Sequence, residues 1–485
     1  MELIEMGLGH RGRMNALYNI VGKDGPSMLR DFDSKETSAW GMRGDVKYHY
    51  GGSGARVTPS GRKVYMNMAP QPSNVESVNP VVMGKTRAIQ DRRNGDREKT
   101  MMLNVHTDAA FAGQKTVYET LGLAGLNGYE IGGTLRFIVN NQVGFTTDAW
   151  QARSSPYCTD VAKILDASVV HGLFTITNSS LSETAAMGFE FGYSLADPNT
   201  LVMWEAQFGD FANNAQVIID NYVASSEKKW LQRSGVVLSL PHGYDGQGPE
   251  HTSARLERFL QLGDEDSRKF PSTEQLQRQH QDANIQVVCM TSPANYFHVL
   301  RRQIHRDFRK PLIILFSKSL LRHPLARSDI EEFIETPYFQ PLLPETQHGI
   351  NINKLEDIKR VIFCSGQVYA ALYKYRETHG LKDTAITRIE ELHPFPWEQV
   401  RQNLDNYPNA TDVVWCQEET LNGGAWSYVM PRFEVILAKT ENHTDKKIRY
   451  AGREPMSSVA VGYKVLHAVE EEKLLGDAFQ MSPDE

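Results

Sequence analysis

The chain has 485 residues, of which 40% are hydrophobic and 23% charged, as in a folded protein of about three domains. Its formal net charge of −7 argues against a nucleic-acid-binding protein, and its longest apolar runs, such as 312–316, are far shorter than the roughly twenty residues of a membrane-spanning helix. We therefore expect neither a nucleic-acid nor a membrane partner.

The ends of the chain and its cysteines carry little further signal. The acidic start, Met1 to Met6, runs directly into structured-looking sequence, so we expect no signal or transit peptide and a start inside a larger gene product. Four separated cysteines without a Cys-x-x-Cys pair predict buried thiols in a reducing compartment. They are Cys158, Cys289, Cys364 and Cys416.

Composition and periodicity divide the chain into three predicted domains, residues 1–177, 178–345 and 346–485. Prolines between 324 and 344 mark the second boundary. In the last segment, strand-like runs at 360–364, 385–389 and 412–415 alternate with helical stretches. This alternation predicts a small parallel αβ domain.

The strongest chemical signal lies in the first segment. Asp108 follows a strand-like run at 101–105 and precedes a helical pattern at 116–126, while Asn141 ends a second strand-like run at 135–139. Such a βαβ unit makes the strands parallel, so Asp108 and Asn141 are expected at one carboxyl edge, beside a helix N-terminus that favours phosphate. The pattern predicts a site for Mg²⁺ and a diphosphate.

This metal-bearing segment is short for a doubly wound sheet. Only residues 142–177 remain after Asn141, enough for a loop, a helix near 160–165 and one more strand. We therefore expect part of the apolar face of the sheet to need a partner.

Glu183 allows two interpretations. Ser180-x-x-Glu183 has the spacing of a capping box at the start of an apolar helix. Alternatively, Glu183 is a buried acid that binds a heterocycle nitrogen and has a pKa raised by burial. The two interpretations of Glu183 are compatible with each other.

Further candidate site residues are histidines beside a glycine-rich loop, a histidine with two arginines, and a pair of phenylalanines. His242 and His251 flank a glycine-rich loop after a strand-like run at 236–240, which suggests acid/base chemistry or a structural role. His10 with the cations Arg11 and Arg13 suits an anionic substrate, or else forms a surface ion-pair cluster. The aromatic pair Phe208 and Phe211 could wall a planar ring or pack in a core, and Arg153 offers a further phosphate or carboxylate donor.

The chain resembles the thiamine-diphosphate-dependent decarboxylating component of the 2-oxoglutarate dehydrogenase complex, in the transketolase-like superfamily. The resemblance covers nearly the whole chain and is carried by ten segments that occur in the same order. These segments are GHRGR, GDVKYH, DAAFAGQ, VNNQVGFTT, ARSSPY, NSSLSE, WEAQFGDF, HGYDGQGPEH, KSLLRHP and WCQEE. The resemblance implies an α/β fold: a shortened diphosphate/metal-binding domain (1–177), a pyrimidine-binding domain (178–345) and a transketolase-like C-terminal αβ domain (346–485).

The resemblance also implies roles for individual residues. Asp108, Asn141 and the carbonyl of Val143 would hold Mg²⁺, Glu183 would activate the aminopyrimidine of the cofactor, and His251 would exchange protons near the reacting carbon. The other implied assignments are Ala109, Ala110, Phe208 and Phe211 for the cofactor, His10, Arg11 and Asn74 for the substrate, and His10 and His242 as further catalytic residues.

The implied reaction is oxidative decarboxylation of 2-oxoglutarate in the tricarboxylic acid cycle, with transfer of the succinyl group to the lipoyl group of the dihydrolipoyl succinyltransferase component. The family implies a homodimer with the cofactor at the subunit interface. It also implies the mitochondrial matrix in a eukaryote or the cytoplasm in a bacterium.

The chain departs from the family pattern at five places. Thr107 and Lys115 replace glycines, which would cost on the order of 1–3 kcal/mol if either position required φ > 0, although Lys115 could meet a phosphate instead. Asn74 replaces a histidine of the substrate pocket. Between Asp166 and Phe174 the chain lacks a domain-sized stretch that the family pattern contains. It also lacks the N-terminal region of the family pattern. A non-catalytic paralogue acting as an interaction subunit and a 2-oxoadipate-preferring homologue therefore remain alternatives.

Overall fold

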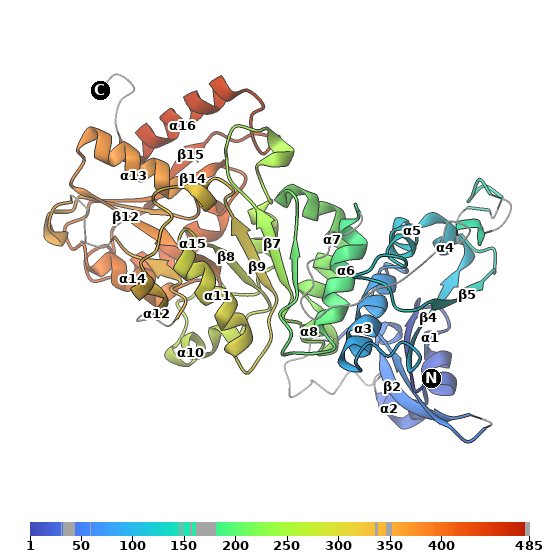
Figure 1. Ribbon diagram of the computed structural model, residues 1–485. Coiled ribbons are helices and arrows are strands. Elements are labelled where there is room, and N and C mark those ends of the chain that lie inside the picture. The colour runs from blue at the N-terminus through green and yellow to red at the C-terminus, as the bar shows by residue number, and fades with distance from the viewer. Residues whose placement is uncertain are drawn as a thin grey trace. The chain divides into compact units, whose positions relative to one another are not determined.

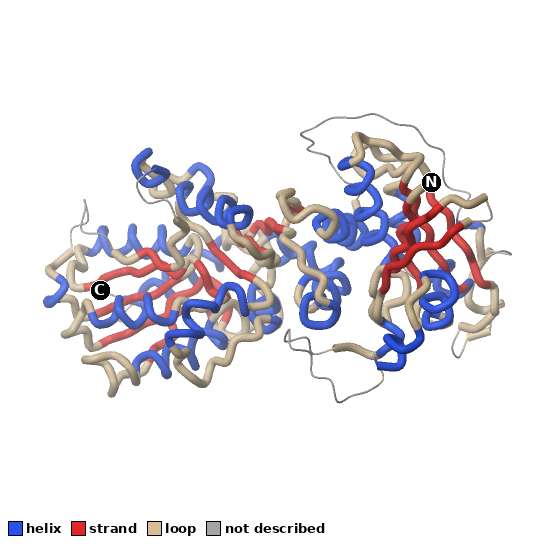
Figure 2. The backbone as a smooth tube through the Cα atoms, turned by 90° about the horizontal axis from the view of Figure 1, so that it is seen from below, coloured by secondary structure: helices blue, strands red, loops and turns tan. Residues whose placement is uncertain are grey.

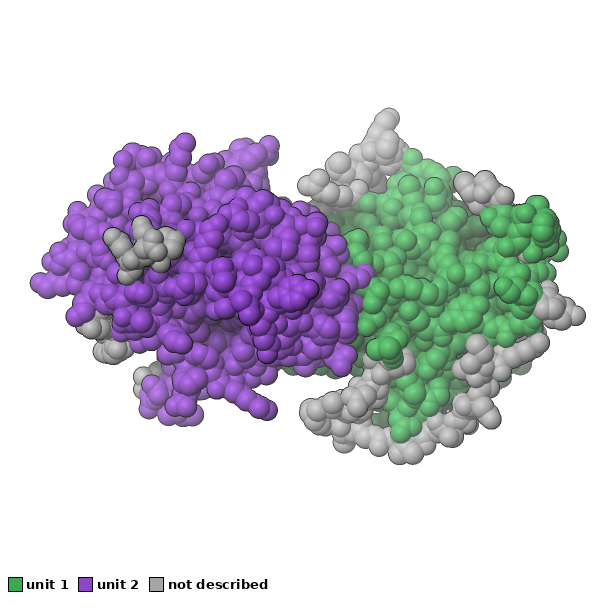
Figure 3. Space-filling view, turned by 90° about the horizontal axis from the view of Figure 1, so that it is seen from above, with its two compact units in different colours: residues 1–204, 214–236 green, residues 205–213, 237–485 purple. Residues whose placement is uncertain are grey.

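The computed structural model describes residues 1–30, 32, 44–58, 60–144, 147–148, 150–155, 158–161, 181–334, 338–345 and 352–480. Figure 3 distinguishes two compact units. Unit 1 consists of Met1–Trp204 and Asn214–Val236, and unit 2 of Glu205–Asn213 and Val237–Glu485. Among the described helices, none is both long and apolar enough to cross a bilayer.

Unit 1 is built around a five-stranded sheet with the order β2-β3-β1-β4-β5 (Figure 1). Its strands are β1 (Leu3–Leu8), β2 (Gly52–Val57), β3 (Lys63–Met68), β4 (Thr100–Thr107) and β5 (Thr134–Val139). The neighbours β3, β1, β4 and β5 run parallel, and only the edge strand β2 is antiparallel. The carboxyl ends of four strands therefore lie at the same edge of the sheet.

Both faces of this sheet carry buried apolar side chains, because successive residues of a strand point to opposite sides. Met102 packs with one cluster and Leu103 with another. The helices of unit 1 are α1 (Arg13–Asn15), α2 (Gly25–Arg30), α3 (Val78–Arg92), α4 (Asp108–Gly113), α5 (Lys115–Gly122), α6 (Glu183–Ser194), α7 (Gln216–Ile218) and α8 (Ser226–Trp230), with π-helical turns at Ala16–Val21 and Ile219–Val223.

The helices α3 and α6 lie side by side (Figure 1) and approach closely because both carry glycine on the facing side. A Cβ atom at Gly84 would collide with the backbone of Phe189, and one at Gly192 with the backbone of Val81. This approach fixes α6, whose first residue is Glu183.

Unit 2 contains two sheets, with the orders β13-β8-β9-β7-β6 and β10-β12-β11-β14-β15. The first sheet comprises β6 (Met203–Glu205), in which the unit boundary falls, with β7 (Val237–Pro241), β8 (Gln286–Cys289), β9 (Leu312–Phe316) and β13 (Glu391–His393). The second comprises β10 (Leu342–Leu343), β11 (Arg360–Cys364), β12 (Thr384–Ile389), β14 (Asp412–Thr420) and β15 (Ile448–Arg453). The short strands β13 and β10 pair antiparallel with their neighbours, whereas β7, β8 and β9 pair parallel, as do β11, β12, β14 and β15.

Helices lie on both sides of the strands of unit 2 (Figure 2). They are α9 (Leu256–Leu262), α10 (Thr273–Asp282), α11 (Pro293–His305), α12 (Ile330–Ile334), α13 (Val368–His379), α14 (Trp397–Asp405), α15 (Trp426–Leu437) and α16 (Lys464–Phe479). Short 3₁₀ turns occur at Lys47–His49, Gly209–Ala215, Pro249–His251, Leu320–Arg322 and Leu355–Asp357.

The predicted α/β class and the strands on both sides of Asp108 are confirmed, as are the three strands of the C-terminal segment. The four cysteines are buried free thiols, as expected. The edge strand β5 exposes apolar side chains: Leu135 is 43%, Phe137 55% and Val139 51% exposed. This agrees with the expectation of an incompletely covered sheet. The predicted helix near 160–165 lies largely outside the described residues.

Candidate functional site

Candidate residues gather at the carboxyl edge of the sheet in unit 1. His10 follows β1, Asn74 follows β3, Asp108 begins directly after β4, and Asn141 follows β5. The parallel register, in which Thr107 is paired with Val139, brings the last two together. The shared edge predicted for Asp108 and Asn141 is therefore confirmed.

Asp108 is 1% exposed and begins α4. The backbone N–H of Gln142 donates to its Oδ1 at 3.2 Å, so the turn after β5 closes onto the carboxylate. Arg153 Nη1 lies 3.6 Å from its Oδ2. A carboxylate beside a turn with amide and carbonyl oxygens is the donor set that a hard cation such as Mg²⁺ prefers.

The turn itself is organised by Asn141. Its Oδ1 accepts from the backbone N–H of Val143 at 3.0 Å, and Gln142 adopts the left-handed conformation with φ of 56°. The part of the chain that the structure describes holds no cluster of three or more His, Cys, Asp or Glu side chains suited to a metal. A cation here would therefore need the amide of Asn141 and backbone carbonyls besides Asp108.

The two substitutions next to the metal loop introduce no backbone strain. Thr107 is extended, with φ of −96° and ψ of 154°, and Lys115 begins α5 without a positive φ. The side chain of Lys115 donates to the carbonyl of Asn214 at 2.9 Å. The strain penalty considered from the sequence does not apply.

A buried polar network supports the strand that carries Asp108. His106 Nδ1 lies 2.7 Å from Glu76 Oε2, which also accepts from Asn79 Nδ2 at 2.9 Å. Arg136 Nη1 lies 3.2 Å from His106 Nε2. Because the guanidinium can only donate, Nε2 must accept and Nδ1 must carry the proton given to Glu76. Burial lowers the pKa of Arg136 to about 10, against the opposing charge of Glu76.

Sequence reasoning missed this network, since Glu76 and His106 are 30 positions apart. The only signal was two polar residues, Asn104 and His106, two apart in an otherwise apolar strand, which places both on one face.

His10 lies in the loop between β1 and α1, half-buried and 6.1 Å from the ring of Tyr48 between centroids. Burial, together with the nearby His49, Arg11 and Arg13, lowers the pKa of His10. Its Nδ1 has no hydrogen-bond partner among the described residues. A neutral, partly open imidazole is suited to substrate contact.

The other two predicted substrate residues, Arg11 and Asn74, are exposed. Asn74 Oδ1 accepts from Asn221 Nδ2 at 3.2 Å. Arg13 is different: it is completely buried and donates to the carbonyls of Leu8, Tyr50 and Ala69. The prediction of Arg13 as a second cation for an anion is therefore wrong, because its guanidinium ties three backbone segments together.

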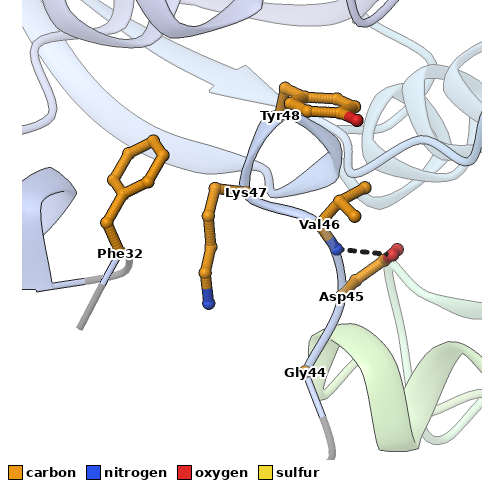
Figure 4. Close-up of a pocket in the computed structure, with 6 residues that line it drawn as sticks. All are labelled: Phe32, Gly44, Asp45, Val46, Lys47 and Tyr48. Atoms are coloured by element: carbon orange, nitrogen blue, oxygen red, sulfur yellow. Dashed lines mark hydrogen bonds between the residues drawn. The ribbon is translucent and has the colours of Figure 1, made fainter. Parts of the chain in front are cut away.

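A hollow lies in the same unit, lined by the side chains and backbone of a short segment before β2 (Figure 4). Its lining residues are Phe32, Gly44, Asp45, Val46, Lys47 and Tyr48. Asp45 Oδ2 is held by His49 Nδ1 at 3.0 Å and by Trp230 Nε1 at 3.0 Å. These bonds fix Tyr48, which faces His10.

Glu183 is the first residue of α6 and is half-buried. The helix is capped by Ser182, whose Oγ accepts from Ala185 N at 3.3 Å. The prediction that Ser180 caps this helix is wrong, because the N-cap is Ser182. Ser180 itself lies outside the described residues. Glu183 Oε2 instead accepts from Asn214 Nδ2 at 3.3 Å.

In unit 2 the predicted aromatic pair and one histidine come together. The ring of His251 lies 4.4 Å from Phe208 and 6.4 Å from Phe211 between centroids, and the two phenylalanines are 5.8 Å apart. Lys318 Nζ lies 3.8 Å from the centre of the Phe208 ring. His251 itself is exposed, so its imidazole is accessible for proton transfer.

His242 lies in a closed network instead. Its Nδ1 accepts from the backbone N–H of Ala254 at 3.0 Å, so the proton is on Nε2, which lies 2.7 Å from Glu419 Oε1. The adjacent Glu418 accepts from Gln367 Nε2 at 3.1 Å, and burial raises the pKa of Glu418 to about 8. Both ring nitrogens of His242 are thus engaged, and they hold the strand end after β7 to β14.

The molecule thus combines parallel αβ units, an oxygen-donor set at one sheet edge and a separate cluster of aromatic rings with an imidazole. The matching family models identify it as a dehydrogenase E1-type component with a transketolase-like pyrimidine-binding domain. Family models match in sequence order: the dehydrogenase E1 component at residues 8–171, the transketolase pyrimidine-binding domain at 147–324, and the 2-oxoglutarate dehydrogenase C-terminal region at 327–479. The chain belongs to the 2-oxoglutarate dehydrogenase family.

Several relatives support this membership. The mitochondrial 2-oxoglutarate dehydrogenase of Schizosaccharomyces pombe is 37% identical over 712 residues, covering 98% of this chain and 70% of the relative. The mitochondrial 2-oxoglutarate dehydrogenase of Saccharomyces cerevisiae is 38% identical over 721 residues, covering 99% of this chain and 71% of the relative. The 2-oxoglutarate dehydrogenase E1 component of Brucella ovis is 31% identical over 731 residues, covering 99% of this chain and 70% of the relative.

These alignments are much longer than the 485 residues of the chain, so they contain large gaps on its side. The first two family models overlap at residues 147–171, next to the predicted junction between Asp166 and Phe174. Both findings are consistent with the shortening inferred from the sequence.

Proposed function

We propose that the chain catalyses the oxidative decarboxylation of 2-oxoglutarate with thiamine diphosphate and Mg²⁺ in the tricarboxylic acid cycle. The observation that carries the proposal is the closure of the Asn141–Val143 turn onto the buried carboxylate of Asp108. This oxygen-donor set fits a cation that carries a diphosphate. Family membership supports the same reaction.

The residues divide the work as follows. Asp108, Asn141 and the carbonyl of Val143 hold Mg²⁺, while the backbone at Ala109 and Ala110 faces the diphosphate. Thiamine diphosphate, when bound, supplies the nucleophilic carbon and electron sink that decarboxylation of a 2-oxo acid requires. Glu183 orients and hydrogen-bonds the aminopyrimidine.

The remaining residues bind the ring, the substrate and its protons. Phe208 and Phe211 would flank a ring of the bound cofactor, and the imidazole of His251, 4.4 Å from the Phe208 ring between centroids, would accept and donate protons beside them. His10, Arg11 and Asn74 bind the substrate carboxylates. His242 supports the loop before His251, since both of its nitrogens are engaged.

We further propose that residues 1–177, 178–345 and 346–485 form the metal-binding, pyrimidine-binding and C-terminal domains. The partner implied by the family is the succinyltransferase component, whose lipoyl group receives the succinyl group. A homodimer with the cofactor at its interface would cover Glu183, which is only half-buried in one chain. The mitochondrial relatives favour the matrix in a eukaryote, and a bacterial chain would be cytoplasmic.

Calorimetric titration of the full chain with thiamine diphosphate in the presence of Mg²⁺ tests the proposal. We expect saturable heat that Asp108→Ala abolishes and that the exposed Asp445→Ala leaves unchanged. Turnover is then measured with 2-oxoglutarate and an artificial electron acceptor, and faster turnover of 2-oxoadipate would assign the longer substrate. Absence of saturable heat in the wild type contradicts the enzymatic proposal.

One observation favours a second candidate, a non-catalytic interaction subunit. The edge strand β5 leaves Leu135, Phe137 and Val139 about half exposed, as a sheet edge that another protein covers would be. A chain that binds the succinyltransferase component in ultracentrifugation but binds no thiamine diphosphate would support this candidate.

A further inference from the structure

Lys115 connects the segment after Asp108 to Asn214, which is bonded to Glu183. It begins α5, immediately after the short helix α4 that starts at Asp108. Its side chain reaches to Asn214, 99 positions further along the chain, where Nζ donates to the backbone carbonyl at 2.9 Å.

Asn214 is a junction between this lysine and the helix that carries Glu183. Its carbonyl also accepts from Thr184 Oγ1 at 2.5 Å, and its side-chain Nδ2 donates to Glu183 Oε2 at 3.3 Å. Thr184 is completely buried, whereas Asn214 itself is exposed. Asn214 lies in the 3₁₀ turn Gly209–Ala215, and the bonds from Lys115 and Thr184 both end on its carbonyl oxygen.

We propose that Lys115 is a positioning residue for Glu183: it anchors Asn214, and Asn214 orients the carboxylate toward the aminopyrimidine of thiamine diphosphate. This inference rests on the proposed function, because it needs thiamine diphosphate as the ligand. The competing role is direct contact of the ammonium with the diphosphate. The bond to Asn214 favours the first role, since it directs one of the three N–H donors of the ammonium to the residue that is bonded to Glu183.

The two roles differ in the ligands they affect. Inorganic pyrophosphate with Mg²⁺ presents the diphosphate without an aminopyrimidine, so a residue that acts through Glu183 should not affect its binding. We expect Lys115→Met to weaken thiamine diphosphate binding about tenfold, the value of one charge-assisted hydrogen bond, and to leave the Kd of pyrophosphate unchanged. Lys115→Arg, which keeps a charged donor, should restore most of the affinity.

A double variant tests whether Lys115 affects thiamine diphosphate binding through Asn214. Asn214→Ala removes the bond to Glu183, so adding Lys115→Met to it should cause little further loss of affinity. Thermal unfolding of each variant checks that the exposed substitutions leave the fold intact.

The outcomes are distinct. Equal weakening of both ligands by Lys115→Met would assign Lys115 to the diphosphate and overturn the proposal. So would unchanged affinity for both ligands, or additive losses in the double variant. A wild-type chain that binds pyrophosphate but shows no saturable binding of thiamine diphosphate would overturn the proposed function, and the role of Lys115 would fall with it.

Discussion

The contact between α3 and α6 provides a direct test of how the helix bearing Glu183 is held. A Cβ atom added at Gly84 would lie 2.7 Å from the carbonyl carbon and 2.9 Å from the Cα of Phe189, and nearer still to its carbonyl oxygen. These are backbone atoms of α6, so no side chain can turn aside to relieve the overlap. Gly84→Ala must push the two helices apart.

The expected cost follows from two opposing effects. Overpacking of a well-packed contact costs roughly 1–3 kcal/mol, and a collision with backbone belongs at the upper end of that range. Alanine recovers about 1 kcal/mol, because it is the better helix former. We therefore expect Gly84→Ala to lower the free energy of unfolding of unit 1 by about 2 kcal/mol.

Urea unfolding followed by far-ultraviolet circular dichroism measures this change, with Gly122→Ala as the matched control. Gly122 also lies in a helix, but an added Cβ there would have no described atom within 4 Å, so we expect a neutral or slightly stabilising effect. Because α6 begins at Glu183, Gly84→Ala should also weaken thiamine diphosphate binding. Equal behaviour of the two variants would refute the assigned contact.

Three further predictions concern buried polar groups. Glu76→Gln replaces the carboxylate that accepts from His106 and Asn79. We expect it to lower the free energy of unfolding, measured in urea, by about 3 kcal/mol. A decrease below about 1 kcal/mol would contradict a network that depends on this carboxylate. The pKa of Glu418 is about 8, above the value of about 4.3 in an unfolded chain, so its contribution to stability is full below pH 4 and is lost as the pH rises toward 8. Glu418→Gln should flatten the fall of Tm between pH 5 and about 8, and an unchanged slope would contradict the assignment. Burial raises the pKa of Cys289 to about 12, and all four cysteines are buried, so the native chain should react with Ellman's reagent only after denaturation; one rapidly reacting thiol would disprove this.

Local patterns predicted much of the fold. The apolar runs before Asp108 and Asn141 form the parallel strands β4 and β5, and the three C-terminal runs form β11, β12 and β14. Spacing placed Asp108 and Asn141 at one edge, because the ends of parallel strands meet there. The catalytic and binding roles of the site residues remain predictions.

Local patterns were misleading wherever a polar group found a partner far along the chain. Arg13 resembled a surface cation but is buried against three carbonyls, two of them from later segments. Lys115 bonds to Asn214, a partner 99 positions away that spacing did not indicate. The cap of α6 is Ser182 although Ser180 has the spacing of a capping box.

The sequence by itself thus determined the α/β class, the parallel strands and the family, because periodicity and ordered motifs are local properties. Only the tertiary structure decided which polar groups meet. The buried pair Glu76 with His106 and the exposed pair Asn214 with Glu183 both form across about thirty residues of chain. Local sequence could not show either pair, because the packing of the strands and helices brings the partners together, and the bond between Glu76 and His106 is also shielded from water.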